Sequence, residues 1–589
     1  MKFTRWFVAL VFAAGAVSSR GATPKFFPDD PIAADVETQD ASGVAVQDLS
    51  DPYDFLENTF MNPADTANIR AENVNTLDEV PDSSWFTNRI LARPMSVDEI
   101  VRGSVTGGAP KGPWLVVGAK TEGITPGMTV RDARNDVYFI KFDPPSNPEM
   151  ATGAEVVTTP VFHALGYNVP ENYLATIRRE DLRIDPTTLL HREITGQRTP
   201  MTEEDLTTLL AKAARNPDGS YRVVASKAVE GKPLGPFRYY STRSDDPNDI
   251  FSHEHRRELR AMRVFAAWLN HDDSRSINSL DTLVRRDGRA LVKHHLIDFG
   301  STLGSGSTQA QKPRAGNEYL WEARPTFLTM LTLGFYVRPW IKVRYPDMPS
   351  VGRFEGAFFS AEQWKPEYPN PAFGNARADD LFWAARRVAA FSDDAIRAVV
   401  KTGQFSDPRA EIYIGDVIIL RRDKAARCWL NATNPVIDFA MERDGTMTFR
   451  NASADLRFGP AAQEYRVAWA RFDNNTGEAT AVGQPSVVHT PRAQAPRELQ
   501  SASYIRASVT SHHAEQPNWV HPVYVFFRHT NTGWRTVGLE RIVDRLGLAG
   551  DPRLGTRGRA TRTDESRPEP RSAISANLES SRTQGLTPF

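Results

Sequence analysis

Three polar side chains occur at a spacing that suits phosphoryl transfer. Asp273 is followed five positions later by Asn278, and Asp298 comes twenty positions after that. Phosphoryl transfer needs a group that orients or deprotonates the attacking hydroxyl, and it needs oxygen ligands that hold Mg²⁺ on the phosphates. Carboxylate and amide oxygens can supply both functions. Asp273, Asn278 and Asp298 are therefore the first candidates for a catalytic site.

The residues between Asn278 and Asp298 predict a β-hairpin. Apolar residues in 280–284 and 290–297 have the character of two strands, and Gly288, which can adopt a positive φ, supplies the turn between them. Because the two ends of a hairpin meet, we expect Asn278 and Asp298 to lie side by side. The alternative is that the aspartates cap a helix and that residues 298–300 form an ordinary turn at the end of a strand.

The same stretch resembles the catalytic loop and metal-binding turn of protein kinases. His271–Asp273 stands where kinases have His-Arg-Asp, Asn278 completes the Asp-x4-Asn spacing, and Asp298–Gly300 is the Asp-Phe-Gly triplet. The resemblance implies that Asp273 handles the acceptor hydroxyl. It also implies that Asn278 and Asp298 bind Mg²⁺.

Two further positions bear on that resemblance. Arg275 stands where many kinases have a lysine two residues after the catalytic aspartate, which implies a place in the catalytic loop. Asp272 replaces the family's arginine, a residue that often pairs with a phosphorylated activation segment. The sequence therefore does not imply that kind of regulation.

The region before this loop has the layout of a kinase small lobe. Strand-like runs cover 114–117, 128–131 and 137–142, and the third run carries Lys141. The resemblance implies that Lys141 contacts the phosphates of ATP. The connecting segment 118–127 lacks the family's glycine triplet, and a solvated strand lysine is the alternative for Lys141.

A helix is predicted to follow from Asn147, a good N-cap, to a C-terminal cap at Gly166. Glu155 lies near its middle, where the resemblance places the glutamate that steadies the strand lysine. Glu149 is the competing partner, and a surface position is the alternative for either glutamate. Pro160 is expected to kink or break this helix.

The order of the elements predicts an α+β protein. A two-lobed kinase-like domain, with a β-rich small lobe and a helical large lobe, would be followed by an all-β sandwich-like module. The predicted divisions are 1–22 signal peptide, 23–51 exposed linker, 52–113 N-terminal extension that packs on the core, 114–235 small lobe and hinge, 236–430 helical large lobe, 431–549 β-sandwich-like module and 550–589 disordered tail.

Further elements follow from periodicity and turn signals. Helices are expected to begin at Thr202 and Ser252 and to cover 327–335, 361–364, 379–391 and 393–400, while strands are expected at 172–177, 221–226, 447–450, 464–472, 503–509 and 520–527.

Composition limits the classes of function. Lys and Arg total 71 and Asp and Glu total 72, so no global field draws the protein to nucleic acid or to an anionic membrane. Cys428 is the only cysteine, which excludes an intrachain disulfide and a cysteine zinc cluster. Its apolar, strand-like surroundings predict a buried, inert thiol. His253 and His255 lack the i, i+4 spacing of a helical zinc site, and we expect them to be solvated.

The N-terminus predicts export. Lys2 and Arg5 precede an apolar run from Trp6 to Val17, which is short for a membrane span and suits a signal-peptide core. No later stretch reaches transmembrane length, so we expect no span after signal removal and a periplasmic or envelope location in a bacterium.

Two phrases, Gly166–Asn172 and His253–Leu259, resemble an uncharacterised family of exported bacterial proteins. The missing glycine triplet makes the kinase resemblance closer to the atypical HipA-type and lipid-kinase-like branches.

Three functions remain open at this point. The first is an exported phosphotransferase that uses ATP and Mg²⁺ to modify a protein, lipid or glycan acceptor. Because ATP is scarce outside the cytoplasm, the second is an inactive kinase-like scaffold of the cell envelope. The third keeps the nucleotide site but transfers a nucleotidyl group.

Overall fold

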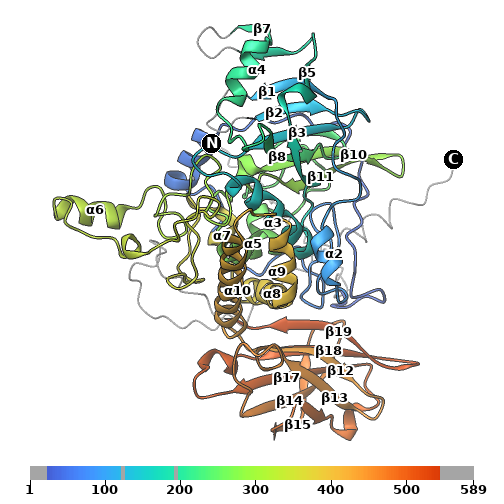
Figure 1. Ribbon diagram of the computed structural model, residues 1–589. Helices are drawn as coiled ribbons and strands as arrows, with labels where there is room; N and C mark the ends of the chain where they lie inside the picture. Colours follow the sequence, from blue (N-terminus) through green and yellow to red (C-terminus); the bar gives the residue numbers. More distant parts are fainter. Residues whose placement is uncertain (1–22, 121–126, 192–196, 544–589) are drawn as a thin grey trace, which may run out of the picture.

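The computed structural model describes residues 23–120, 127–191 and 197–543. The chain folds into a mixed α+β protein with several sheets (Figure 1). A six-stranded sheet lies at one end, helices occupy the middle, and the C-terminal strands form the other end. The predicted signal peptide and tail lie outside the described residues. No helix within the described ranges is long and apolar enough to cross a bilayer.

The first sheet has the strand order β4-β8-β3-β2-β1-β5, and only the β1–β5 pair is parallel. The strand predictions for this region are confirmed. The strands are β1 Trp114–Lys120, β2 Gly127–Arg131, β3 Val137–Phe142, β4 Asn172–Ile177, β5 Leu182–Ile184 and β8 Tyr221–Lys227, with β6 Leu189–His191 and β7 Arg198–Pro200 as a separate pair.

Strand β3 alternates cleanly between two faces. Tyr138, Ile140 and Phe142 are buried in a core shared with α4 (Glu203–Leu210). Because neighbouring strand residues point to opposite faces, Lys141 must face away from that core. The register of the whole sheet thereby decides where this ammonium group lies.

Helix α3 differs from the sequence prediction at its start and at Pro160. It covers Met150–Leu165, so Asn147 is not its N-cap. The helix also continues through Pro160 without a break. A proline has no N–H to donate to the carbonyl four residues earlier, Val156, and the Thr402 hydroxyl donates to that carbonyl instead at 3.2 Å. Thr402, which is distant in the sequence, thus donates the hydrogen bond to the Val156 carbonyl that Pro160 cannot donate.

The central helices pack into one large apolar core. The predicted helices at 379–391 and 393–400 are confirmed, and the side chain of Ser392 caps the second of them. The helices are α5 Arg257–Leu269, α6 Ala323–Leu331, α7 Pro371–Gly374, α8 Ala378–Ala389, α9 Asp393–Lys401 and α10 Pro408–Leu430.

Four expectations for this region were wrong. Residues 361–364 form turns rather than a helix, and α6 begins earlier than the predicted 327–335. The segment capped by Ser252 opens with a 3₁₀ turn, His253–His255, before α5. Cys428 lies on α10, half-buried, rather than on a strand, and burial raises its pKa to about 12.

Residues 23–51 are not an exposed linker. Phe26 is buried against the C-terminal strands, whereas Ala41 and Val44 are buried against a central hairpin. Their apolar contacts outweigh the polar composition that suggested a linker. The following residues form α1 Asp51–Leu56, a π-helical turn Glu57–Met61 and α2 Val97–Arg102, and side chains from 71–100 enter the central core.

The hairpin predicted between Asn278 and Asp298 is confirmed. Strand β10 (Ser279–Arg286) pairs with β11 (Arg289–Leu296) in antiparallel register, and β9 (Lys232–Gly235) adds a third strand. Gly288 has φ +80° in the turn, as its position requires.

The C-terminal strands form two sheets that share one apolar core. The smaller sheet has the order β12-β13-β16 and the larger has the order β15-β14-β17-β18-β19. The strands are β12 Val436–Met441, β13 Thr446–Asn451, β14 Glu464–Phe472, β15 Ala479–Val488, β16 Arg492–Gln494, β17 Tyr504–His512, β18 Val523–Thr530 and β19 Gly533–Arg541, with the short α11 Ala452–Asp455 after β13.

A buried arginine joins the N-terminal segment to the central helices. The guanidinium of Arg257 is fully buried and contacts three carboxylates, those of Asp78 at 2.8 Å, Asp380 at 2.9 Å and Asp379 at 3.1 Å. Asp78 lies in the N-terminal segment before the first sheet, and the other two belong to α8. One cation therefore fixes the position of a segment that has little regular structure of its own.

We expect Arg257→Met to lower the free energy of unfolding by about 3–5 kcal/mol, because it removes the completely buried cation of the cluster. Each of the three carboxylates then keeps a single arginine partner, Arg70 for Asp78, Arg377 for Asp379 and Arg260 for Asp380. Urea denaturation followed by tryptophan fluorescence measures the change. Arg397→Met is the control: its ion pair with Asp416 is exposed, and its loss should change stability by about 0.5 kcal/mol or less. Equal losses in the two variants would mean that the buried cluster does not join these segments.

Candidate functional site

A cavity of about 310 Å³ lies between the first sheet, helix α3 and the base of the hairpin. One part of its lining is apolar and includes Met128, Val229, Leu280 and Ile297. The other part is polar and carries Lys141, Glu155 and Asp298, with Gly300 and Ser307 beside them. Three of the six site residues predicted from the sequence therefore line one cavity.

Lys141 lies at the centre of the polar part. Its Nζ is 3.0 Å from Glu155 Oε2 and 2.9 Å from Asp298 Oδ1. Burial by itself lowers the pKa of this ammonium group, but the carboxylates of Asp298 and Glu155 more than offset that effect, so the pKa lies above its ordinary value. Lys141 is therefore a protonated side chain that faces the cavity.

Glu155 is buried on α3, and burial raises the pKa of its carboxyl group. Besides Lys141, it accepts a hydrogen bond from the Asn172 side chain on β4 at 3.0 Å. Glu149, the alternative partner for the lysine, instead accepts a hydrogen bond from the backbone of Ser406. The structure thus places Glu155, and not Glu149, against the strand lysine.

Asp298 follows β11 in a tightly packed turn. It has φ +62°, and the next residue, Phe299, is completely buried against Phe162 of α3 and His271. Gly300 then leaves room for the charged groups. A Cβ there would lie 3.2 Å from Glu155 Oε2 and 3.5 Å from Asp298 Oδ1, which would crowd both carboxylates.

The hairpin brings Asn278 next to the residue before Asp298. The backbone N–H of Ile297 donates to the carbonyl of Asn278 at 3.0 Å. The Asn278 side chain donates to the carbonyl of Asp273 at 2.8 Å. Asn278 starts the hairpin and is not among the residues that line the cavity.

Asp273 and Arg275 also lie outside the lining. They form an ion pair with each other, and Arg275 Nη1 further contacts Asp51 at 3.1 Å and Glu367 at 3.3 Å. Sequence reasoning missed Asp51 because it belongs to a segment more than two hundred residues earlier. Asp54, on the same short helix, accepts a hydrogen bond from Ser276 at 3.1 Å, so α1 supports this loop at two points.

The residues present are compatible with a magnesium ion held partly by a ligand. Among the described residues, no group of three or more His, Cys, Asp or Glu side chains could hold a metal ion. Mg²⁺ in phosphate-transfer sites uses one or two protein carboxylates or amides and takes its other ligands from phosphates and water. Asn278 and Asp298 carry side-chain oxygens, and the hairpin brings the backbone of Asn278 next to the residue before Asp298.

The histidines do not contribute to this cavity. His253 and His255, expected to be solvated, are buried. His253 Nε2 lies 2.7 Å from Asp249, and His255 Nδ1 lies 2.6 Å from Arg260. Their role is to fix the approach to α5.

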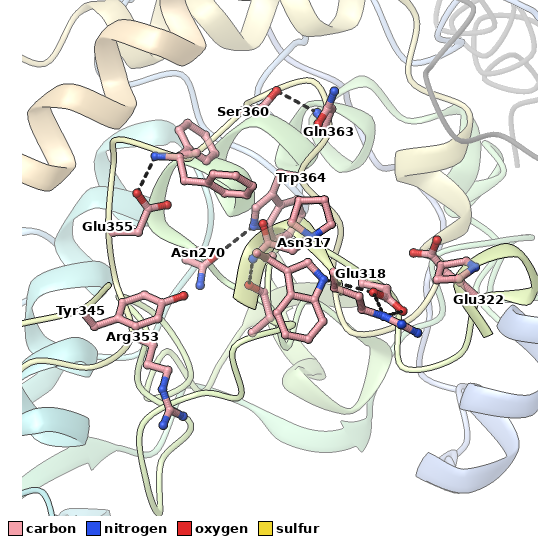
Figure 2. Close-up of a pocket in the computed structure, with 18 of the residues that line it drawn as sticks. Asn270, Asn317, Glu318, Glu322, Tyr345, Arg353, Glu355, Ser360, Gln363 and Trp364 are labelled. Atoms are coloured by element: carbon pink, nitrogen blue, oxygen red, sulfur yellow. Dashed lines mark hydrogen bonds and ion pairs between the residues drawn. The ribbon is translucent and has the colours of Figure 1, made fainter. Parts of the chain in front are cut away.

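A second cavity, of about 300 Å³, lies at the base of the segment that carries α6 (Figure 2). Its ionic groups are satisfied within the protein. Arg338 pairs with Glu318 at 2.7 Å, and Arg421 donates to carbonyl groups at the end of α5. Trp364 donates to Asn270 at 2.8 Å on the cavity wall. These contacts hold the wall together and offer no cluster of groups comparable to that around Lys141.

Asp272, where kinases have arginine, is buried beneath the candidate catalytic loop. Burial raises the pKa of its carboxyl group to about 7, and the nearby carboxylates of Glu367 and Asp273 contribute to the shift. Between pH 4 and pH 7 the folded protein therefore retains a proton that the unfolded chain releases. It follows that this residue makes the protein less stable as the pH rises through that range.

We expect Asp272→Asn, which imitates the protonated carboxyl group, to remove this loss of stability at rising pH. The difference in unfolding free energy between the variant and the wild type should grow by on the order of 3 kcal/mol from pH 4 to pH 7. Urea denaturation across that range measures it, with Asp416→Asn at an exposed position as the control. Parallel stability curves for Asp272→Asn and the wild type would contradict a raised pKa.

Comparisons with known proteins give limited information. No protein-family model matches the sequence, and no curated protein matches it. Among solved structures, a Helicobacter pylori proinflammatory kinase, CtkA, is 12% identical, with 56% of this chain and 94% of that chain covered at a TM-score of 0.28. The Golgi casein kinase with Mn/ADP bound is 10% identical, with 68% and 94% covered at a TM-score of 0.27. Both similar structures are kinases, but these TM-scores are too low to assign any residue here.

Proposed function

We propose that this protein is a kinase-like phosphotransferase that uses ATP and Mg²⁺. The observation that carries the proposal is the position of Lys141, whose ammonium group lies between Glu155 of α3 and Asp298 at the end of the hairpin, inside a cavity. A strand lysine, a helix glutamate and an aspartate after a hairpin are the three charged groups that kinase sites bring together around the nucleotide phosphates.

The two parts of the cavity suit the two parts of a nucleotide. The apolar lining, with Val229 at the predicted hinge and Leu280 and Ile297 around it, would receive the adenine ring. The polar part would receive the phosphates, with Lys141 as their cation. Glu155 would then hold Lys141 in place, because its carboxylate is buried on a rigid helix.

The opposite side of the hairpin would handle the acceptor. Asp273 would orient the acceptor hydroxyl and take its proton as the oxygen bonds to the terminal phosphorus, while the bond from that phosphorus to the bridging oxygen breaks and ADP leaves. Arg275, already paired with Asp273, would hold that carboxylate in position. Asn278 and Asp298 would hold Mg²⁺, which when bound offsets the negative charge of the phosphates.

Several finer points remain predictions from the sequence. They are the export of the chain, the relation to the HipA-type or lipid-kinase-like branches and to exported bacterial proteins, and the division into two lobes and a β-sandwich-like module. The acceptor is a protein, a lipid or a glycan.

Nucleotide binding tests the proposal directly. ATP with Mg²⁺ at about one hundred times its Kd should add about 2.7 kcal/mol to the stability of the wild type, which a thermal melt detects. Lys141→Met combined with Glu155→Gln should fold, because it removes the buried charge pair together, and should show no such shift. Lys212→Met, at an exposed position, is the control and should respond like the wild type. A folded wild type that ATP does not stabilise would favour the scaffold alternative.

Turnover tests the acceptor side. In assays of ATP hydrolysis and of label transfer from ATP, Asp273→Asn should reduce the rate by about a hundred-fold or more, because it removes the group that takes the acceptor proton. Asp298→Asn should abolish the turnover that depends on Mg²⁺, because it removes a ligand of the ion. Asp287→Asn, in the exposed turn of the same hairpin, is the matched control and should leave the rate unchanged. Label transferred from the α-phosphate rather than the γ-phosphate would indicate nucleotidyl transfer and contradict the proposed reaction.

A further inference from the structure

The segment 318–349, called the arm below, exposes an unusual amount of apolar surface. In Figure 1 its helix α6 stands out from the rest of the molecule. Helix α6 has no buried residue, and neither has the 3₁₀ turn Pro339–Lys342. Leu333 and Phe335 are 87% and 85% exposed, and Met330 and Phe327 are 71% and 64% exposed. Soluble proteins rarely expose so many large apolar side chains together unless another surface covers them.

The arm is nevertheless a folded structure. Glu318 accepts from Arg338 at 2.7 Å and from Trp340 at 3.1 Å, and Arg338 also donates to Thr329 at 2.6 Å. Glu322 pairs with Lys365 of the main body at 2.8 Å (Figure 2 labels both glutamates). The arm therefore directs the carboxylates of Glu318 and Glu322 inward, where they are neutralised, and its apolar side chains outward. That arrangement is the reverse of an ordinary surface loop.

The outward charges of the arm are mostly positive. Arg324, Lys342 and Arg344 are exposed, and in the part of the chain that the structure describes no carboxylate forms an ion pair with them. Asp347 is the exposed acidic side chain of the arm. The surface that the arm offers thus combines aromatic and aliphatic groups with unpaired cations.

The exposed apolar surface continues onto the N-terminal segment. The ring of Phe60 lies 5.1 Å from that of Trp321, and both side chains are partly exposed, as are Tyr53 and Met61. Two segments that are distant in the sequence thereby contribute to one exposed apolar surface.

We propose that the arm docks this protein on a lipid bilayer that contains anionic lipid. Apolar side chains of this kind insert at the boundary of headgroups and acyl chains, and lysine and arginine side chains reach from them to lipid phosphates. A second copy of the chain fits less well, because a two-fold symmetric contact would bring the same unpaired cations together. The positive charge of the arm is local and is therefore compatible with the near-zero net charge of the whole sequence. Docking of the arm on a bilayer does not depend on the proposed phosphotransfer.

Vesicle co-sedimentation of the full chain tests this inference. We expect binding to vesicles of phosphatidylcholine mixed with phosphatidylglycerol, weaker binding to phosphatidylcholine alone, and a loss of the difference at high salt. Arg324→Gln, Lys342→Gln and Arg344→Gln together should weaken binding to the mixed vesicles about a hundred-fold. Phe327→Ser, Leu333→Ser and Phe335→Ser together should weaken it by at least as much.

The matched control is Ile412→Ser with Val487→Ser, which removes exposed apolar side chains elsewhere and should bind like the wild type. Melting temperatures establish that each variant folds. The proposal is overturned if the wild type does not bind the mixed vesicles or if the apolar variant binds them as well as the wild type does. It is also overturned if light scattering shows a wild-type dimer that the apolar variant abolishes while vesicles have no effect, because the arm is then an interface between copies.

Discussion

The contact of one ammonium group with two carboxylates determines how the central part of this molecule is arranged. Lys141 comes from the first sheet, Glu155 from a buried helix and Asp298 from the end of a hairpin, so their meeting fixes three elements relative to one another. Glu155 cannot remain buried and ionised without a cation close by. The surrounding structure serves this requirement: β3 turns Tyr138, Ile140 and Phe142 to the opposite face from Lys141. Phe299 anchors the turn after Asp298, and Gly300 leaves space for the charges.

A second set of charges fixes the loop that would face the acceptor. Arg275 is held by Asp273 of its own loop, by Asp51 of the N-terminal segment and by Glu367 of the segment that follows the arm. Each partner comes from a different part of the chain. The loop is therefore defined by long-range ion pairs, whereas the cavity is defined by secondary structure. This difference explains why the cavity has a simple pattern in the sequence and the surroundings of the loop do not.

Structural features that depend on residues close together in the chain could be predicted from the sequence. The alternation in 137–142, the turn at Gly288 and the spacing of Asp273, Asn278 and Asp298 each reflect local geometry, and the strand and the hairpin occur as expected. The roles assigned to the site residues stay predictions.

The features that could not be predicted depend on contacts between residues that are distant in the sequence. Pro160 stays inside a helix because Thr402 satisfies the open carbonyl, and residues 23–51 are packed because their apolar partners lie elsewhere in the chain. Helix α10 was not predicted because its buried face includes Arg421 and Arg422, whereas Ile412 and Leu420 are exposed. The apolar residues of the helix therefore do not mark its buried face.

The packing of Phe26 has a consequence for biosynthesis. Its ring lies 5.1 Å from Phe526 and 5.9 Å from Phe472, so it is enclosed by strands that follow it by more than four hundred residues. A ribosome delivers Phe26 first, and its ring must wait without these partners until those strands have emerged. The contact therefore forms late relative to the synthesis of Phe26 itself.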